Sequence, residues 1–334
     1  MLYWVLLGSL ACSGGVKVSE DTSVPARPAT SGPAETGDTA GDTADTDAVV
    51  IDCNKLPPPQ KPTRLEAPSG YNDLVFDADG AMIGNDSHSL IRAASPTDSQ
   101  VFSPNTGTIY KMGYLPNGDI VATASSRDII TITPEGVSSV LVSGLNGYGL
   151  SVGSDGLVYV GTNYDTNDTS GIYRIDPTNG DMELYIDASD YAPRALEFSA
   201  DYSRLYFGTL NGGKVMVVDL DDNLDPIGEP KKLVVVPEGW HDTLEVDACG
   251  NVYVGAFFSW SIYRISAIDH SIVTLVSWNF NNYGHGFEWG DPSGGWDEMA
   301  IYITHPYNGT WVDEHVIGVP SRTYQGEVMG ARTL

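Results

Sequence analysis

One hydrophobic pattern recurs along the chain. An alternating run of apolar residues leads into a short polar turn, and a second alternating run follows and ends in Gly or Thr. The turns lie 38 to 47 residues apart, at Gly80, Gly118, Gly156, Ser203, Gly250 and Gly294. A period of about 40–45 residues with four strands in each unit is typical of the blades of a β-propeller.

Two further apolar runs follow each of the first five copies of the pattern and one follows the sixth, all short, rich in Val, Ile and Tyr and bounded by Gly, Asn, Asp and Pro. No stretch keeps a helical apolar period over three turns. The predicted fold is therefore all-β, a six-bladed β-propeller with four-stranded antiparallel blades. The third strand of the last blade is expected at 315–319. The blades are expected at about 71–104, 108–144, 147–189, 192–237, 241–278 and 284–320.

The last blade lacks an obvious outer strand after Val319, whereas residues 63–67 precede the first blade without a partner. Donation of 63–67 to the last blade would close the ring and remove an open sheet edge. The C-terminal segment 324–330 is the alternative donor.

Residues 1–52 do not fit the repeat. Met1–Ala11 is a short apolar run of the length found in secretory signal peptides, and its end at Cys12 resembles the bacterial lipoprotein cleavage box. A plain signal peptide, or a start codon placed too far downstream, is the alternative. Residues 13–52 are Gly, Ser, Thr, Pro, Ala and acids, which predicts a disordered tether. We therefore expect an exported protein, anchored in the bacterial envelope (outer membrane, periplasmic or surface side) through lipid on Cys12, with its folded domain at 53–334.

The chain carries 44 acidic and 17 basic residues, a formal net charge of −27. An acidic domain argues against binding to nucleic acid or to an anionic membrane surface. Contact with the membrane is expected through the lipid alone, and the domain is expected to be a monomer.

Three cysteines are present. With Cys12 lipidated, Cys53 and Cys249 remain as a pair in an oxidising compartment, which predicts a disulfide that fastens the tether to the propeller. Two unpaired thiols are the alternative.

The propeller places one residue of each blade at the channel entrance, two positions before the first apolar residue of the innermost strand. Six polar or aromatic side chains converging on one axis predict a small-molecule or metal pocket. These mouth residues are Asn72, Tyr110, Tyr148, Arg194, Asp242 and His285.

The phrases APRALEFSADYSRLYF (192–207) and HDTLEVDACGNVYV (241–254) resemble blades of the gluconolactonase, senescence-marker-protein and luciferin-regenerating family. The resemblance implies a divalent cation, usually calcium, at the mouth, held by a Glu, an Asn and an Asp that also serves hydrolysis. Asp242 matches the Asp, Asn72 stands at the Glu position, and Arg194 stands at the Asn position. Tyr148 stands where the family has a further Asn that contacts substrate.

These departures affect the metal site, since calcium prefers six to eight oxygen ligands and a guanidinium has no acceptor. Arg194 is expected to replace the metal as the counter-charge of Asp242. The alternative is that Arg194 turns outward while Asn72, Asp242 and water still hold Ca²⁺.

His241 and His285 are candidate general bases, with Asp242 orienting the ring, although a histidine at a loop end is more often structural. The loops between the second and third strands of each blade carry aromatic residues that suit stacking on a sugar or peptide, notably Trp260 and Phe257. Phe257 can instead pack between blades. The oxygen-rich segment 163–171 fits a turn better than an ion site.

The favoured function is a ligand- or protein-binding module with the mouth and its aromatic loops as the binding surface. A calcium-dependent lactonase or esterase is the alternative from the resemblance. A structural interaction protein of the envelope is a third hypothesis. Fold alone does not decide among them.

Overall fold

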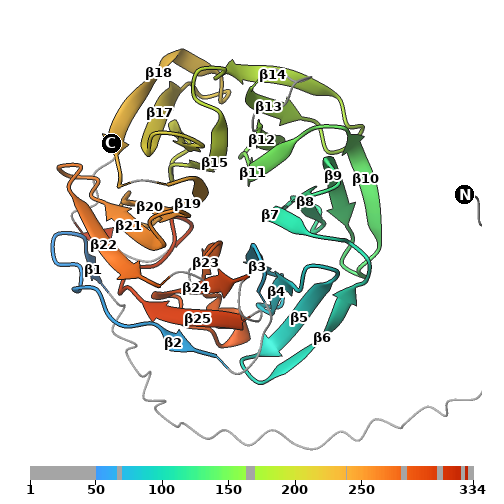
Figure 1. The fold of residues 1–334 in the computed structure, drawn as a ribbon, viewed down its shortest axis with the longest axis horizontal. Coiled ribbons are helices and arrows are strands. Elements are labelled where there is room, and N and C mark those ends of the chain that lie inside the picture. The colour runs from blue at the N-terminus through green and yellow to red at the C-terminus, as the bar shows by residue number, and fades with distance from the viewer. Residues whose placement is uncertain are drawn as a thin grey trace, which may run out of the picture. The chain divides into compact units, whose positions relative to one another are not determined.

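Six four-stranded antiparallel sheets stand around a central channel in the computed structural model of the chain (Figure 1). The structure describes residues 50–65, 70–162, 170–237, 239–279, 284–306, 311–324 and 328–329. The predicted six-bladed propeller is confirmed. The predicted signal peptide with Cys12 and most of the predicted tether lie outside the described residues, as do residues 163–169.

In blades 1 to 5 the four strands follow one another in chain order from the central axis outward, whereas the outer strand of blade 6 is β2 (Thr63–Arg64) (Figure 1). Blades 1 and 2 comprise β3 (Leu74–Phe76), β4 (Met82–Asn85), β5 (Leu90–Ser95), β6 (Asp98–Ser103), β7 (Ile109–Tyr114), β8 (Ile120–Ala124), β9 (Asp128–Ile132) and β10 (Ser138–Ser143). Blades 3 and 4 comprise β11 (Gly147–Val152), β12 (Val158–Thr162), β13 (Gly171–Ile175), β14 (Met182–Asp187), β15 (Pro193–Phe198), β16 (Arg204–Thr209), β17 (Lys214–Leu220) and β18 (Pro226–Val235). Blades 5 and 6 comprise β19 (His241–Val246), β20 (Val252–Ala256), β21 (Ser261–Ile265), β22 (Ile272–Ser277), β23 (Phe287–Trp289), β24 (Ala300–His305), β25 (Trp311–Val316) and β2 (Thr63–Arg64).

The turn between the first and second strands of a blade is built by an aspartate, or by Asn117 in blade 2, together with a residue of positive φ. In blade 5, Asp247 Oδ1 accepts the N–H groups of Cys249 and Asn251, both at 2.8 Å, and Gly250 has φ 79°. In blade 4 the positive φ belongs to Tyr202, at 57°, rather than to a glycine. These six turns define one face of the propeller, called here the turn face. The opposite face is the mouth face.

Blade 6 departs from the repeat in two places. Its first turn is a longer loop containing the 3₁₀ helix η1 (Pro292–Gly294), and Gly295, not the predicted Gly294, takes the positive φ of 79°. Its third strand is Trp311–Val316, so the prediction of 315–319 was wrong. The strand ends at Val316 because the next two amides, of Ile317 and Gly318, both donate to Met299 O.

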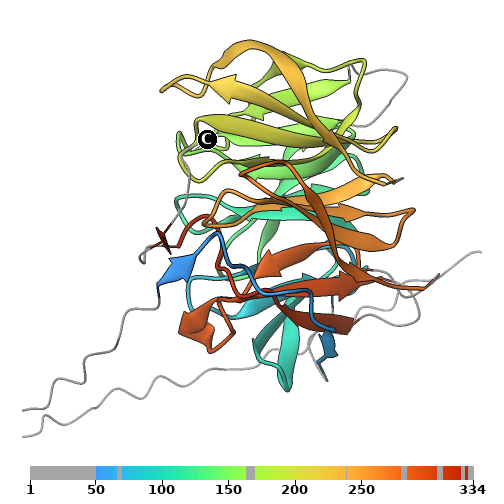
Figure 2. The same ribbon diagram turned by 90° about the vertical axis from the view of Figure 1, so that its left-hand side faces the viewer.

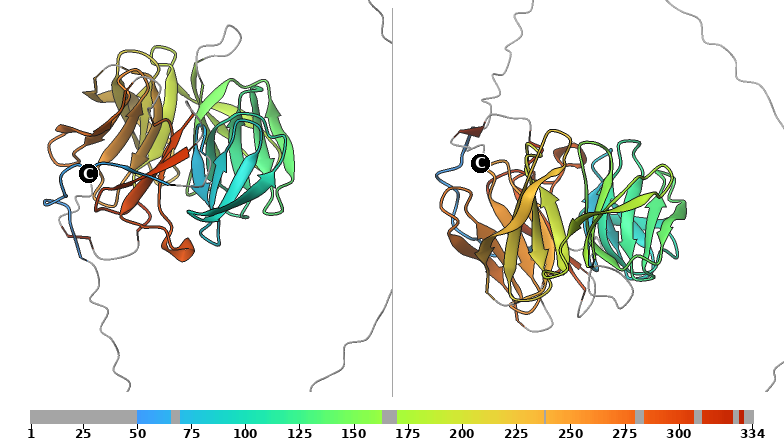
Figure 3. Two further views of the ribbon diagram at one scale, coloured as in Figure 1. Left: turned by 60° about the horizontal axis from the view of Figure 1, so that its bottom comes forward. Right: turned by 90° about the horizontal axis from the view of Figure 1, so that it is seen from above.

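The N-terminal strand closes the ring, as predicted. β2 pairs antiparallel with β25, with Thr63 opposite Glu314 and Arg64 opposite Asp313. The C-terminal segment does not take this place. β26 (Val328–Met329) instead pairs parallel with β1 (Ile51–Asp52) in a separate two-stranded sheet, which Figures 2 and 3 show beside the blades.

The structure contains the predicted disulfide between Cys53 and Cys249, whose Cα atoms are 5.5 Å apart. Cys249 lies in the first turn of blade 5, so the described chain begins on the turn face.

The core lies between neighbouring blades. Four tyrosines at one register of the second strands, each 2% exposed or less, fill these interfaces: Tyr159, Tyr206, Tyr253 and Tyr302. Two of their hydroxyls donate to turn aspartates, Tyr253 to Asp247 and Tyr159 to Asp155. Packing and turn geometry therefore support each other. The described residues include no helix long and apolar enough to span a membrane.

Candidate functional site

The inner strands begin with a β-bulge in four of the six blades. Register shifts occur at Ile109/Lys111, Gly147/Leu150, Pro193/Ala195 and His241/Thr243. A bulge re-aims the side chains around it. In these four blades the mouth residue lies near the bulge. Five of the six mouth residues are less than 9% exposed, in agreement with the convergence predicted from the repeat: Asn72, Tyr148, Arg194, Asp242 and His285.

Arg194 and Asp242 form a buried ion pair at the mouth. Arg194 Nε donates to Asp242 Oδ1 at 2.6 Å. The guanidinium carbon lies 3.5 Å from the centre of the Tyr148 ring and 5.0 Å from that of Trp240. Burial is the largest single effect on the pKa of Arg194 and lowers it, but the charges and hydrogen bonds of Asp242 and Tyr148 together outweigh burial and raise that pKa. Arg194 therefore stays charged and is turned inward.

His285 contacts the Arg194–Asp242 ion pair, and we call these three residues the charged group after its two ions. Its Nε2 is 3.1 Å from Asp242 Oδ2 and 3.4 Å from the Tyr148 hydroxyl oxygen. Burial lowers the pKa of His285 and outweighs the opposite effect of Asp242. The imidazole is therefore neutral near pH 7 and can accept a proton. Tyr110 stacks on Tyr148 at 4.6 Å between ring centres, which holds the phenol in place.

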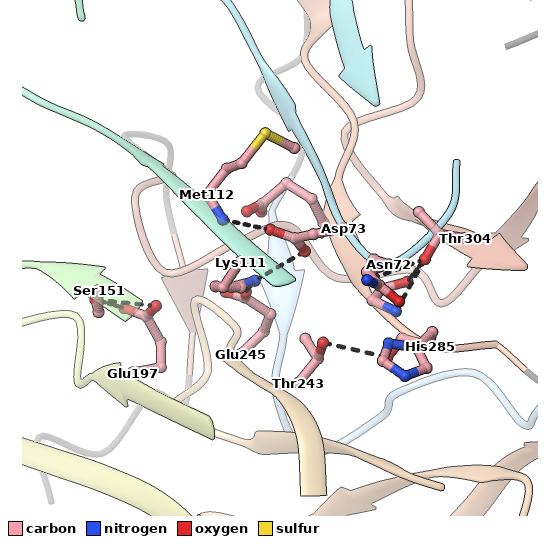
Figure 4. Close-up of polar contacts among 12 residues, drawn as sticks. Asn72, Asp73, Lys111, Met112, Ser151, Glu197, Thr243, Glu245, His285 and Thr304 are labelled. Carbon is pink, nitrogen blue, oxygen red and sulfur yellow. Dashed lines mark hydrogen bonds and ion pairs between the residues drawn. The ribbon is translucent and has the colours of Figure 1, made fainter. Parts of the chain in front are cut away.

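Asn72 has a structural role in the described contacts. Its Nδ2 donates to Ile109 O at 2.9 Å, and Thr304 Oγ1 donates to its backbone oxygen at 3.0 Å (Figure 4). These bonds join blades 1, 2 and 6. The side chain is thus committed to holding blades together.

Two candidates from the sequence do not join this group. His241 is fully buried and packs toward blade 4, where a Cβ added to Gly208 would lie 2.4 Å from the His241 Cβ. Burial lowers the pKa of His241 to about 4. Trp260 lies in the turn between β20 and β21 with φ 50°, and its carbonyl accepts the Trp278 N–H.

Three aromatic side chains surround the charged group, and we call them the aromatic rim: Trp240, Phe257 and Phe258. Trp240 stacks on Phe257 at 5.5 Å and meets Phe258 edge-on at 4.8 Å. Phe257 in turn lies edge-on to His285, at 5.9 Å between ring centres. Phe258 is 53% exposed. The sequence had indicated Phe257 but not Trp240, which precedes the strand β19.

A second layer lines the channel beneath the mouth, and sequence reasoning missed it. Three glutamates, called here the carboxylate layer, follow Arg194, Asp242 and His285 by three positions: Glu197, Glu245 and Glu288. Figure 4 shows two of them with Lys111, whose Nζ donates to Glu245 Oε1 at 2.8 Å and to Asp73 Oδ1 at 3.3 Å. The sequence signal was available in the inner-strand phrases LEF, LEV and FEW, where an acid repeatedly interrupts an apolar run.

The residues at the mouth do not fit calcium. The position expected to supply an amide oxygen carries Arg194, which already bonds the one carboxylate present. Among the described residues no group of three His, Cys, Asp or Glu side chains is arranged to hold a metal ion. Calcium sites need six to eight oxygen ligands with compensating negative charge.

Comparison with known proteins places the chain among propellers. The sequence model described as the SMP-30/Gluconolactonase/LRE-like region matches residues 149–277. A search of curated proteins finds no match. Three solved structures are similar in fold. A luciferin-regenerating enzyme has a TM-score of 0.63 and 17% identity over 80% of this chain and 99% of its own. A gluconolactonase from Xanthomonas campestris has a TM-score of 0.60 and 14% identity, and the match covers 78% of this chain and 99% of its own. Regucalcin from Agrobacterium tumefaciens, described as a calcium-binding protein, has a TM-score of 0.61 and 15% identity, and the match covers 85% of this chain and 99% of its own.

At these identities the solved structures establish the fold, while the sequence match covers the central blades. The chain is a six-bladed β-propeller, and its residues 149–277 match the SMP-30/Gluconolactonase/LRE-like region, which confirms the resemblance predicted from the sequence.

Proposed function

We propose that this protein is an exported, lipid-anchored propeller that binds a small ring-shaped ligand, such as a sugar or a lactone, at its mouth. The observation that carries the proposal is the buried Arg194–Asp242–His285 group beneath the aromatic rim. Burying charged groups is unfavourable unless they are paired, and replacing such a pair with apolar residues is often neutral or stabilising. A polar group kept at this position therefore supports a role beyond folding.

The aromatic rim supports the choice of ligand. An exposed Phe258 and a half-buried Trp240 present ring faces and edges next to hydrogen-bonding groups. Flat or ring-shaped ligands combine stacking with a few directed hydrogen bonds in such sites. We propose that the guanidinium of Arg194, rather than a metal ion, supplies the positive charge there.

The proposed lipid anchor on Cys12 is inferred from the sequence. Cys12 follows a short apolar run, and the described domain begins on the turn face, where Cys53 is bonded to Cys249. A tether from lipid on Cys12 would then direct the mouth away from the membrane. The intact mass of the membrane-extracted protein tests this, because a diacylglyceryl group on an N-terminal cysteine is expected and an unmodified N-terminus would contradict it.

Trp240→Leu is expected to weaken binding of D-glucono-1,5-lactone or D-glucose about tenfold. The reason is that stacking on an aromatic ring contributes about 0.5–1.5 kcal/mol beyond the buried area. Titration followed by calorimetry measures the change, and Trp240→Phe is the matched control because it keeps an aromatic ring. Equal binding by Trp240→Leu would place the site elsewhere, and absence of binding to either compound at millimolar concentration would exclude this ligand class.

Metal-independent hydrolysis of a lactone or ester is the second candidate, favoured by the contact between His285 and Asp242 and by the match to the gluconolactonase-like region. A neutral His285 could take a proton from water at the ring nitrogen that does not face Asp242, while Asp242 orients the ring by accepting a hydrogen bond from Nε2. If so, His285→Gln is expected to lower the turnover rate by about 10²–10⁴. The rate of lactone hydrolysis measured in EDTA is the test, and loss of turnover on chelation would contradict a metal-free mechanism.

A further inference from the structure

A cavity of about 710 Å³ lies on the turn face, at the opposite end of the channel from the mouth. All six blades contribute to its lining, together with residues 320–324, which follow blade 6. Its rim includes side chains that are exposed to solvent, among them Pro116, Ser154 and Thr323. The cavity is therefore open to small molecules from this face.

The segment 320–324 is held firmly against blade 5. Ala248 N donates to Pro320 O at 3.0 Å and Arg322 N donates to Val246 O at 2.9 Å. The Arg322 guanidinium reaches the carboxylate layer, with Nη2 2.6 Å from Glu197 Oε1. One wall of the cavity is thus built by a fixed segment and carries a paired cation.

Two of the three carboxylates in the layer have a cation partner. Arg322 pairs with Glu197, and Lys111 pairs with Glu245. Both contacts are short, at 2.6 and 2.8 Å. The layer therefore receives N–H donors of guanidinium and ammonium type in the protein itself, as charge-assisted hydrogen bonds.

Glu288 is the third member and differs from the other two. It lines the cavity and is half-buried, but it forms no ion pair with any described residue. Its Oε1 accepts only the N–H of Trp289, at 2.9 Å. Burial raises the pKa of Glu288 to about 7, against the opposite effect of Lys111. Lys111 acts on Glu288 through its charge without a direct contact, so the carboxyl faces the cavity with no ion-pair partner among the described residues and is a position for an external cation.

The remaining lining restricts the chemistry of that cation. Apolar and aromatic side chains stand beside the carboxylates, including Phe76, Leu115 and Val152. No three carboxylates in the described residues converge as metal ligands, so a divalent cation is not favoured. An anion would meet an excess of carboxylates.

We infer that the turn-face cavity binds a small organic cation, a primary amine with an apolar body, whose ammonium group is held by Glu288. The apolar body would lie against the cavity wall near Phe76 and Leu115, and the ammonium would add a third N–H donor to the carboxylate layer. This site is separate from the mouth and does not depend on the function proposed there.

Benzylamine and its uncharged isostere benzyl alcohol test the inference on the full-length protein at pH 8. Calorimetry is expected to give binding of benzylamine in the wild type, with benzyl alcohol at least tenfold weaker. Glu288→Gln is expected to weaken benzylamine binding at least tenfold, because the amide keeps the shape but not the charge. Glu229→Gln, which changes an exposed glutamate on β18, is the matched control and leaves binding unchanged.

Several outcomes overturn the inference. They are equal binding of amine and alcohol, unchanged binding in Glu288→Gln, no binding of benzylamine at millimolar concentration, or binding of Ca²⁺ in place of amines. Trp240→Leu, which alters the mouth, is expected to keep benzylamine binding, so failure at one site is distinguishable from failure at the other.

The pH dependence gives a second readout. Benzylamine binding is expected to strengthen from pH 6 to pH 8, because Glu288 loses its proton across this range while the amine keeps its own. The charged groups that act on Glu288 or share the cavity with it are Asp73, Lys111, Glu197, Glu245, Asp291, Glu298 and Arg322. Burial also raises the pKa of Glu245 and of Asp73, so any titration there has the same sign, and both cations remain charged. Binding that weakens with rising pH would contradict Glu288 as the partner.

Discussion

Asp242→Leu is expected to destabilise the propeller by about 3–5 kcal/mol. The change leaves Arg194 charged, with a side chain only 9% exposed and no carboxylate to pair with. The Asp242 side chain is itself only 2% exposed, so solvent hardly screens the charge of Arg194 at this position. The expected result is a large fall in the urea midpoint of unfolding at an unchanged slope.

A double-variant cycle distinguishes the loss of the buried ion pair from a general disruption of the fold. Arg194→Met alone leaves Asp242 without its guanidinium and is expected to cost a similar amount. The double variant Arg194→Met with Asp242→Leu removes both charges and is expected to recover most of the loss, because an apolar pair needs no counter-charge. If the two single losses simply add in the double variant, the buried pair is not the cause.

An exposed ion pair supplies the control. Asp225 lies 3.2 Å from Arg174 Nη1 and its side chain is 57% exposed. Asp225→Leu is expected to change stability by less than about 1 kcal/mol, since water screens this pair. The contrast between Asp242 and Asp225 measures what burial adds at the mouth.

Removal of the disulfide is expected to destabilise the domain by about 2–4 kcal/mol. Cys53 and Cys249 are 196 residues apart in sequence, so the bond restricts a long loop of the unfolded chain. In the folded state it holds the N-terminal segment close to blade 5, only ten residues before the closing strand β2 begins at Thr63. Without it, β2 loses its nearby anchor and the edge of β25 is opened more readily.

Urea unfolding with and without reductant measures this effect. The wild type is expected to lose stability on reduction, whereas the variant carrying both Cys53→Ser and Cys249→Ser is expected to show no response to reductant. Loss of stability in the double-serine variant on reduction would show that the reductant acts elsewhere. An unchanged wild type would contradict a stabilising role for the bond.

The sequence predicted much of the site because the repeat is local. The spacing of the turns fixed the number of blades, and counting back from each turn located five side chains that the structure buries together, among them Arg194, Asp242 and His285. The closing strand and the disulfide followed from a missing outer strand and from an even number of remaining cysteines. Each inference used only positions within one blade or a simple count.

Other features depended on contacts between distant parts of the chain. The position of His241 against Gly208 depends on how β19 lies beside blade 4. The pairing of Arg322 with Glu197 depends on the path of the chain after blade 6. Neither is encoded in the repeat period, because the partner residue lies in another blade or beyond the last one.

By itself, the sequence determined an all-β ring of six blades and which residues lie at the start of or just before each inner strand, because alternation and turn chemistry act over a few neighbouring residues. It favoured closure by the N-terminal strand but left the C-terminal segment as an alternative. Only the tertiary structure decided that Arg194 turns inward onto Asp242 and that Asn72 is occupied in joining blades. It also decided that Glu288 lines a cavity with no ion-pair partner among the described residues. These outcomes depend on burial and on partners many residues away, and the free energy of a buried charge is set by what surrounds it in space.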